Sequence, residues 1–331
     1  MNTPEVSVSV VIPTHRRREL LGRLLRSLEQ QSLGHDSYEV VIVHDYTDDG
    51  TEEMARAWCA RQPFRARYYR KCFRSAARIR EFGVGEARGS VVGFIDDDCV
   101  ATPTWLAAGV AAFRAAQVAA AQTGGAARGI GLVQGKTLPV PCESRGFCTK
   151  TLRIESPTVF FETCNIFYAK EAFVAAGGFS AHFTTYGEDT DLGWRVTQLG
   201  YESGFAPAAL VYHEVFKLSI TKWLTEPWYF RHLPRLVAMY PQLRGSMFGR
   251  YFVSKDTCLF NLLLIALCVG CVSGPLGIAL AVPYFYQRYT GGAHVGGLLP
   301  RLGRVVAGVP RGLVVWLALV TGSIRAQSLL I

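Results

Sequence analysis

The sequence predicts an α/β fold with a doubly wound mixed sheet, followed by a C-terminal hydrophobic helical region. Three observations support this prediction. Short β-branched runs alternate with amphipathic helical patterns over the first hundred residues, which is typical of parallel strands joined by helices. The apolar run Val91–Ile95 ends on three aspartates. No acidic residue follows Asp256, and long apolar runs fill that part of the chain.

The first elements follow from the spacing of their apolar residues. Val6–Ile12 is β-branched and bounded by Pro13, which predicts a buried strand. Arg16–Gln30 repeats leucines at helical spacing, which predicts an amphipathic helix. The same reasoning predicts strands at Glu39–His44, Arg65–Arg70 and Val91–Ile95, and helices at Thr51–Arg61 and Ser75–Arg88.

Beyond residue 100 the alternation is less regular. An alanine-rich helix is expected at Ala101–Ala121, followed by a Gly/Ala loop at Gln122–Gly131. The remaining expected elements are strands at Gly131–Pro141 and Ser156–Tyr168 and helices at Lys170–Ala176 and Glu188–Leu199.

The C-terminal third has the pattern of a membrane-associated region. Leu218–Tyr240 is amphipathic, with tryptophans between basic residues, which fits an interfacial helix as well as ordinary core. Thr257–Tyr286 has no charge, and its thirty residues exceed the ~20 that span a bilayer. Pro275 could instead split it into a re-entrant hairpin. Val305–Thr321 is a second apolar segment.

These patterns predict three parts: an α/β domain over 1–215, amphipathic interfacial helices over 216–250, and hydrophobic membrane-associating helices over 251–331. The number of membrane crossings stays open. If both apolar segments cross, the C-terminus returns to the side of the α/β domain; if the first is a hairpin, the protein is monotopic.

Composition narrows the class of partner. The chain is 50% hydrophobic and 18% charged with a net charge of +9, which excludes a disordered chain and favours an anionic partner. The five arginines after Asp256 punctuate apolar runs and form no continuous basic stripe, so membrane lipid and nucleotide are expected as partners and nucleic acid is not. The nine scattered cysteines fit free thiols in a reducing cytosol. The N-terminus lacks the basic region of a secretory signal.

The strongest chemical signal is the acidic end of the run Val91–Ile95. Asp96, Asp97 and Asp98 follow it directly, and in doubly wound sheets ligands bind beyond the carboxyl ends of the strands. Mg²⁺ and Mn²⁺ prefer oxygen ligands and bridge them to phosphates. Asp96 and Asp98 are therefore candidates for one divalent ion, although a solvated acidic turn would also have this sequence.

Two weaker signals lie further along the chain. Glu188, Asp189 and Asp191 open an expected helix, where acids serve either as a general base or as partners of the helix dipole. His213 follows another apolar run. A single histidine is more often structural, but neutral imidazole also binds Mn²⁺.

Taken together and in order, these segments resemble the family 2 glycosyltransferases of GT-A fold. The resemblance runs from about Val6 to His213. It is carried by VSVVIPTHRRRELLGRLLRSLEQQ, VVIVHDYTDDGT, IREFGVGEARGSVVGFIDDDCV, CNIFYAKEAFVAAGGF and YGEDTDLGWRV. The family usually has two adjacent acids after the second strand, and here His44 stands at the first of these positions, which leaves the nucleotide open.

The resemblance implies a role for each matched position. Asp189 would be the general base and Glu188 would orient the acceptor. The donor would be bound by Pro13, Thr14, Asp45, Arg80, Asp96 and Asp97, and the metal by Asp96, Asp98 and His213.

The function so predicted is that of an inverting, metal-dependent glycosyltransferase using Mn²⁺ or Mg²⁺. It would move a sugar from a nucleotide-diphosphate sugar to a hydroxyl of a glycan or lipid-linked acceptor, in cell-envelope glycan biosynthesis. Its catalytic domain would face the cytosol at the cytoplasmic membrane. The alternatives are a nucleotidyltransferase of similar fold and a non-catalytic membrane scaffold.

Overall fold

The computed structural model describes residues 8–123, 128–141, 148–183, 186–291 and 297–331. The chain divides into two compact units. The first unit comprises Met1–Val140 and Thr151–Glu214, and the second comprises Pro141–Lys150 and Val215–Ile331. The expected division into three parts stays a prediction.

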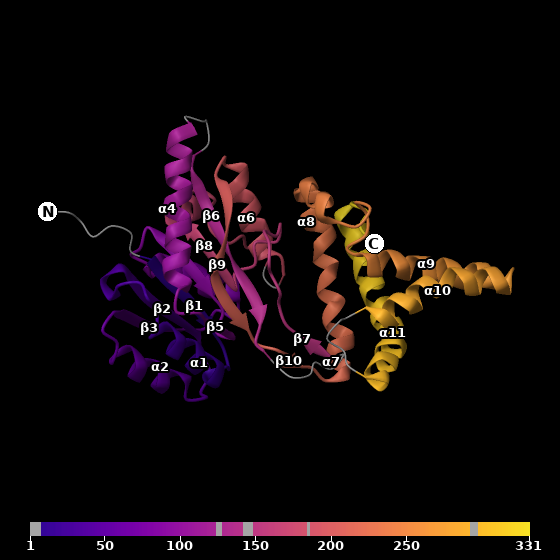
Figure 1. Ribbon diagram of the computed structural model, residues 1–331, viewed down its shortest axis with the longest axis horizontal. Coiled ribbons are helices and arrows are strands. Elements are labelled where there is room, and N and C mark those ends of the chain that lie inside the picture. The colour runs from indigo at the N-terminus through magenta and orange to yellow at the C-terminus, as the bar shows by residue number, and fades with distance from the viewer. Residues whose placement is uncertain (1–7, 124–127, 142–147, 184–185, 292–296) are drawn as a thin grey trace. The chain divides into compact units, whose positions relative to one another are not determined.

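The first unit is built on an eight-stranded mixed sheet with the strand order β3-β2-β1-β4-β8-β6-β9-β5 (Figure 1). The strands are β1 (Val8–Thr14), β2 (Tyr38–Asp45), β3 (Arg65–Lys71), β4 (Val91–Ile95), β5 (Cys99–Ala101), β6 (Ile130–Pro139), β8 (Asn165–Ala169) and β9 (Glu202–His213). The first four are parallel to one another. Strand β8 runs antiparallel to both β4 and β6. The fold is therefore the mixed GT-A-like sheet that the sequence predicts.

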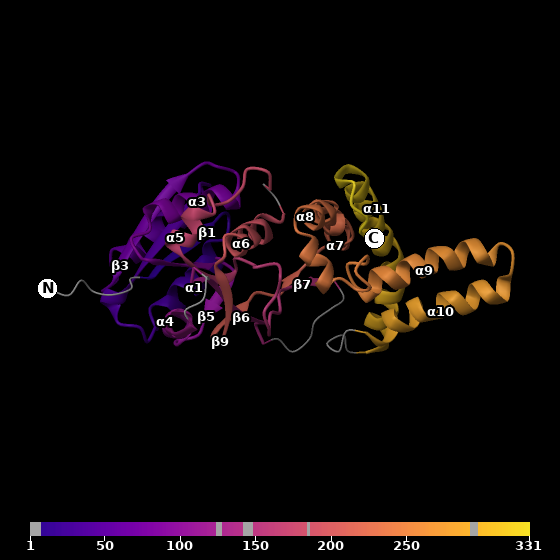
Figure 2. The ribbon, with the colours of Figure 1, turned by 90° about the horizontal axis from the view of Figure 1, so that it is seen from above.

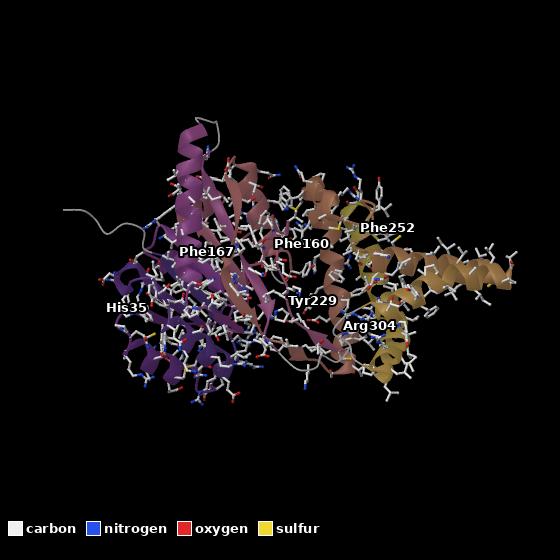
Figure 3. The ribbon with its side chains drawn as sticks, in the orientation of Figure 1. His35, Phe160, Phe167, Tyr229, Phe252 and Arg304 are labelled. Carbon is white, nitrogen blue, oxygen red and sulfur yellow. The ribbon has the colours of Figure 1, made fainter. Side chains whose placement is uncertain are left out.

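Helices cover both faces of this sheet. They are α1 (Arg18–Leu28), α2 (Thr51–Cys59), α3 (Ala76–Glu86), α4 (Trp105–Thr123), α5 (Lys170–Ala175) and α6 (Glu188–Gln198), with a short 3₁₀ helix η1 (His35–Ser37). Figure 2 shows α3 and α4 on opposite sides of the sheet. A Cβ at Gly83 of α3 would lie 2.4 Å from a Val11 methyl, so only glycine allows this close approach. On the other face, Trp105 packs on Phe167 with ring centroids 5.2 Å apart, and Figure 3 shows the place of Phe167 in the first unit.

Most predicted elements of the first unit are confirmed with small shifts at their ends, and Val91–Ile95 is a strand over all five residues. The prediction of a strand over Ser156–Tyr168 is wrong before Asn165. There, Thr158 and Glu162 hydrogen-bond to Gln134, so side chains rather than a strand ladder anchor the segment. Part of the predicted loop Gln122–Gly131 lies outside the described residues.

The second unit is helical apart from one short antiparallel pair. Its elements are β7 (Thr149–Lys150), β10 (Phe216–Lys217), α7 (Ile220–Thr225), η2 (Glu226–His232), α8 (Leu233–Met239), η3 (Pro241–Ser246), α9 (Lys255–Gly270), α10 (Gly274–Thr290) and α11 (Leu298–Ala326). The amphipathic stretch Leu218–Tyr240 forms several short helical segments, because Pro227 and Pro234 each stand near the start of a new one.

The apolar segment Thr257–Tyr286 is likewise not one helix. It forms a hairpin of α9 and α10, whose turn lies just before Pro275. At 16 and 17 residues, each helix is about 25 Å long and too short for the ~30 Å hydrocarbon core. Among the described residues, only Leu298–Ala326 is a helix long and apolar enough to cross a membrane. A single such helix is weak support for membrane association.

Candidate active site

The carboxyl ends of β1, β2 and β4 meet at one edge of the sheet, because these strands are parallel and in register. A cavity of about 580 Å³ opens there, which lies within the usual range for small-molecule sites. It is lined by Pro13, Thr14, His15, Arg17, Asp45, Arg74, Ser75, Ala76, Ile79, Arg80, Asp96, Asp97 and Glu188.

The structure thus brings together all six side chains predicted to bind the donor, Pro13, Thr14, Asp45, Arg80, Asp96 and Asp97. Glu188 reaches the same cavity from the start of α6. Asp98, Asp189 and His213 lie outside the cavity wall. The roles of these residues stay predictions.

Two arginines hold the three aspartates that follow β4. Arg17 Nη1 donates to Asp97 Oδ1 at 2.9 Å and to Asp98 Oδ2 at 2.7 Å. Arg80 Nη2 donates to Asp96 Oδ1 at 2.6 Å. Burial raises the pKa of Asp97 to about 6, although Arg17 opposes the shift. Burial and the neighbouring Asp96 also raise the pKa of Asp98. Three acids with two arginines leave an excess of negative charge, which a cation would neutralise.

Sequence reasoning missed Arg17. The signal that could have found it is the basic run His15–Arg18, which follows the first strand directly. Basic side chains at that point lie at the same sheet edge as the aspartates. Arg17 is about 40% exposed, so it both balances the acids and borders the cavity.

His213 reaches the aspartates through the register of the sheet, in which it is paired with Cys99 on β5. Its Nδ1 lies 2.8 Å from the carbonyl oxygen of Glu214. A carbonyl can only accept, so Nδ1 carries the proton and Nε2 presents a lone pair in the neutral imidazole. Nε2 lies 3.6 Å from Asp98 Oδ1. Two acceptors facing each other at this distance favour a cation between them.

The donor set therefore fits a divalent metal, but not a complete protein cage. Within the described ranges, no group of three His, Cys, Asp or Glu side chains is arranged to hold a metal ion. Mg²⁺ and related ions commonly take one or two protein ligands and complete their shell with substrate phosphates and water. Asp98 and His213, with Asp96 close by, suit that kind of site.

Asp189, the residue predicted to be the general base, is held at the start of α6. It is the second residue of α6, which begins directly after Gly187. Gly187 has a φ of 92°, a backbone conformation that glycine adopts without strain. Its Oδ2 accepts hydrogen bonds from the Thr163 amide at 3.0 Å and the Thr163 hydroxyl at 3.1 Å. Its Oδ1 is buried and has no hydrogen-bond partner. Burial and the adjacent Glu188 raise the pKa of Asp189 to about 7, while Arg80 opposes the shift.

Asp191, another acid in the first turn of α6, forms an ion pair within the helix. Both Nε and Nη2 of Arg195 donate to Asp191 Oδ2, at 2.9 and 2.7 Å, and Asp191 is 1% exposed. This i,i+4 pair stabilises α6. Sequence reasoning did not identify Thr163, because nothing in its local pattern indicates that it contacts a helix 26 positions later.

The last two residues of β2, His44 and Asp45, make structural contacts. Asp45 Oδ1 accepts from the Phe73 amide at 2.9 Å, which orders the loop before α3. His44 is fully buried, and its Nδ1 lies 2.8 Å from the Tyr68 hydroxyl. Burial lowers its pKa. The His44 side chain therefore packs against Tyr68 of the neighbouring strand β3 and does not line the cavity.

Comparison with known proteins identifies the family of this arrangement. The model of Glycosyl transferase family 2 matches residues 9–175, half of the chain. Glycosyltransferase AglE of Haloferax volcanii is 26% identical over 209 residues, covering 60% of this chain and 64% of that relative. The chain thus spans just under two thirds of the length of this curated relative.

Solved structures share the fold at low identity. One is the mannosyltransferase PcManGT from Pyrobaculum calidifontis in complex with GDP-Man and Mn²⁺, with a TM-score of 0.52 and 17% identity over 98% of this chain and 88% of that one. Another is S. aureus TarS 1–349 in complex with UDP-GlcNAc, with a TM-score of 0.53 and 15% identity over 97% and 92% of the two chains.

Proposed function

The chain belongs to glycosyl transferase family 2, and on that premise we propose that it transfers a sugar from a nucleotide-diphosphate sugar to a hydroxyl acceptor, with inversion at the anomeric carbon. One observation carries the proposal. The cavity at the strand ends is bordered by Asp96 and Asp97, and Asp189, which follows the cavity residue Glu188, has a buried carboxylate oxygen without a partner.

The donor would lie in the cavity of about 580 Å³. Thr14 and Asp45 border its nucleotide end, and Arg80 lies beside Asp96 where the diphosphate is expected. A divalent ion held by Asp98 and His213, with Asp96 close by, would supply Lewis-acid stabilisation of the charge on the leaving nucleoside diphosphate. PcManGT, which shares this fold, was solved with Mn²⁺.

Asp189 would act on the acceptor. Its Oδ1 takes the proton of the acceptor hydroxyl as the hydroxyl oxygen bonds to the anomeric carbon. The bond from that carbon to the diphosphate oxygen breaks on the opposite side, and the electron pair leaves with the nucleoside diphosphate. A base with a pKa of about 7 is well matched to neutral pH. Thr163 holds Oδ2, so Oδ1 is the oxygen left to accept the proton.

We further propose that this reaction takes place at the cytosolic face of a membrane, on a glycan or lipid-linked acceptor of the cell envelope. The support is the apolar helix Leu298–Ala326 and the apolar surface of the α9–α10 hairpin. Nucleotide sugars are cytosolic, so the first unit would face the cytosol.

The test is incubation of the purified chain with labelled UDP- and GDP-sugars, with and without Mn²⁺. A family 2 glycosyltransferase releases nucleoside diphosphate and transfers the labelled sugar. A nucleotidyltransferase, with pyrophosphate added, would instead break the bond between the two phosphates and release sugar phosphate and nucleoside triphosphate, and a scaffold would do neither. Loss of sugar transfer in Asp189→Asn, with nucleotide binding retained, would support the assigned base.

A further inference from the structure

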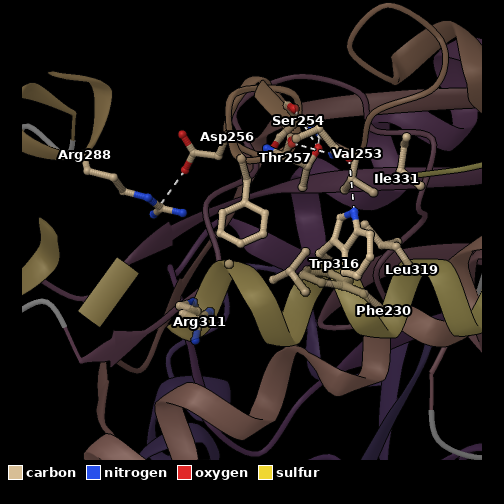
Figure 4. A pocket seen from close by; sticks show the side chains of 14 residues that line it. Phe230, Val253, Ser254, Asp256, Thr257, Arg288, Arg311, Trp316, Leu319 and Ile331 are labelled. Atoms are coloured by element: carbon tan, nitrogen blue, oxygen red, sulfur yellow. Dashed lines mark hydrogen bonds and ion pairs between the residues drawn. The ribbon is translucent and has the colours of Figure 1, made fainter. Parts of the chain in front are cut away.

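The second unit contains a cavity of its own, of about 250 Å³, where the start of α9 meets the middle of α11. Figure 4 shows its wall. Arg288 and Arg311 lie toward one side, while Trp316, Leu319 and Phe230 lie toward the other. The cavity is therefore amphipathic, with a basic part and an apolar part.

The basic part has more positive than negative charge. Arg288 Nη1 is paired with Asp256 at 3.3 Å. Arg311 donates from Nη1 to the Trp223 carbonyl and lies 4.3 Å from the centroid of the Trp223 ring, but no described carboxylate lies within 4 Å of it. Glu226, the acid with the largest electrostatic effect on Arg311, forms its own ion pair with Lys150. The wall therefore carries two guanidinium groups and one side-chain carboxylate, that of Asp256. This excess of positive charge favours an anionic ligand.

The other polar side chains of the wall already have partners. Ser254 and Thr257 form a capping box at the start of α9. Asn261 accepts a hydrogen bond from Trp316 Nε1 at 3.1 Å and donates to the Thr257 carbonyl at 2.9 Å. The two arginines are therefore the groups that determine which ligand charge the cavity accepts.

The helices that form the cavity also carry exposed apolar side chains. Leu313 and Leu317 on α11 are 44% and 43% exposed, and Ile265 and Ile278 on the hairpin are 54% and 70% exposed. Exposed apolar patches of this kind mark lipid or protein contacts. Arg288 and Lys255 stand at the charged end of the same hairpin, where lipid head groups would lie.

We propose that this cavity binds a lipid phosphate, with the phosphate on Arg288 and Arg311 and the start of the hydrocarbon chain against Trp316 and Leu319. Arginine forms paired, charge-assisted hydrogen bonds to phosphate oxygens. The inference goes beyond sugar transfer and does not depend on it. The lipid is either an anionic membrane phospholipid or the isoprenoid-type phosphate of a lipid-linked acceptor.

The experiment measures binding of dodecyl phosphate to the full-length chain in a neutral detergent, without sugar donor. The signal is tryptophan fluorescence, and Trp316→Phe identifies the part that comes from the cavity wall. We expect saturable binding of dodecyl phosphate. Inorganic phosphate and dodecanol should each bind at least tenfold more weakly, because each offers only half of the contacts.

Four variants locate the site. Arg311→Gln and Arg288→Gln should each weaken dodecyl phosphate binding at least tenfold. Arg301→Gln removes the same charge from an exposed position of α11 outside the cavity and should leave binding unchanged. Val315→Phe, which narrows the cavity and keeps both arginines, should also weaken binding while nucleotide binding to the first unit stays intact.

Competition identifies the source of the lipid. Displacement of dodecyl phosphate by dioleoyl phosphatidic acid indicates a membrane phospholipid, and displacement by farnesyl phosphate indicates an isoprenoid phosphate. Equal loss of binding in Arg301→Gln, or unchanged binding in Val315→Phe, would overturn the assignment to this cavity. Equally tight binding of inorganic phosphate would contradict the proposed contact between the cavity and the hydrocarbon chain of the lipid. Because no donor is present, these results are independent of whether sugar transfer is observed.

Discussion

The two units treat their apolar side chains in opposite ways. In the first unit, β-branched and aromatic residues of the sheet such as Val10, Val41 and Phe94 are completely buried. Among the described large apolar side chains that are exposed, only Val118 and Val174 belong to this unit. The others lie in the second unit, where Val272 at the tip of the hairpin is 92% exposed.

Charged side chains are also distributed differently in the two units. The first unit places three aspartates together at one edge of the sheet, where two arginines hold them. The second unit has no acid after Asp256, and five arginines interrupt its apolar sequence. The difference supports the proposal that the second unit, unlike the first, contacts a membrane.

Metal removal should give the largest effect and should affect only the first unit. EDTA is expected to reduce sugar transfer to background, and Mn²⁺ or Mg²⁺ to restore it, because Asp98 and His213 are placed to share a cation with the donor diphosphate. Asp98→Asn should remove most activity and leave the circular dichroism spectrum unchanged. Full activity in EDTA would contradict the metal-dependent mechanism.

Loss of the proposed base should give the next largest effect. Asp189→Asn is expected to reduce kcat by ~10²–10⁴, the usual contribution of general-base catalysis, with little change in donor binding. Asp191→Asn is the matched control two positions away. Asp191 pairs with Arg195, so this variant should lower Tm and affect kcat much less. A collapse of donor affinity in Asp189→Asn would instead place Asp189 in the nucleotide site.

Removal of the second unit tests whether that unit, and not the first, is responsible for membrane association. Full-length chain should stay in the membrane pellet after an alkaline carbonate wash, and a chain ending at Glu214 should be soluble and bind nucleotide. A chain ending at Tyr251 should aggregate, because it keeps α8 and loses α11. Gly322 of α11 lies so close to the Arg231 carbonyl that a Cβ there would be 2.2 Å from its oxygen. Release of the full-length chain by carbonate would contradict membrane association.

The sequence is informative where a feature is local. The strand Val91–Ile95 and the acids after it are contiguous, and apolar runs followed by helical spacing predicted β1 to β4 and their helices. It was uninformative for β9, which has a polar start and contains Pro207. It also left open whether Thr257–Tyr286 is one helix or two, since the turn before Pro275 lies within an uninterrupted apolar run.

The same difference between local and distant features applies to the candidate site. The strand-end residues Thr14, Asp45 and Asp96 could be predicted to meet, because parallel strands bring their carboxyl ends to one edge. The contacts of Arg17 with the aspartates, and of Thr163 with Asp189, depend on side chains far apart in the chain. No periodicity encodes such contacts, so only the folded sheet reveals them.

The smallest predicted effect concerns Thr163, whose hydroxyl donates to Asp189 Oδ2 at 3.1 Å. Thr163→Val removes this hydrogen bond and keeps the shape of the side chain. A hydrogen bond to the ionised form lowers a carboxyl pKa, so its loss should raise the pKa of Asp189 by about one unit, the equivalent of ~1.4 kcal/mol. Thr163→Ser is the matched control, because it keeps the hydroxyl.

The sign of the pH effect follows from the role of the base. Asp189 must be ionised to take the acceptor proton, so kcat should rise with pH through the pKa of about 7. In Thr163→Val the midpoint of this rise should move upward by about one pH unit, and kcat at pH 7 should fall roughly fivefold. Above the new midpoint the variant should regain most of the wild-type rate. A uniform loss of kcat at every pH, shared with Thr163→Ser, would instead show that Thr163 supports packing and does not tune the base.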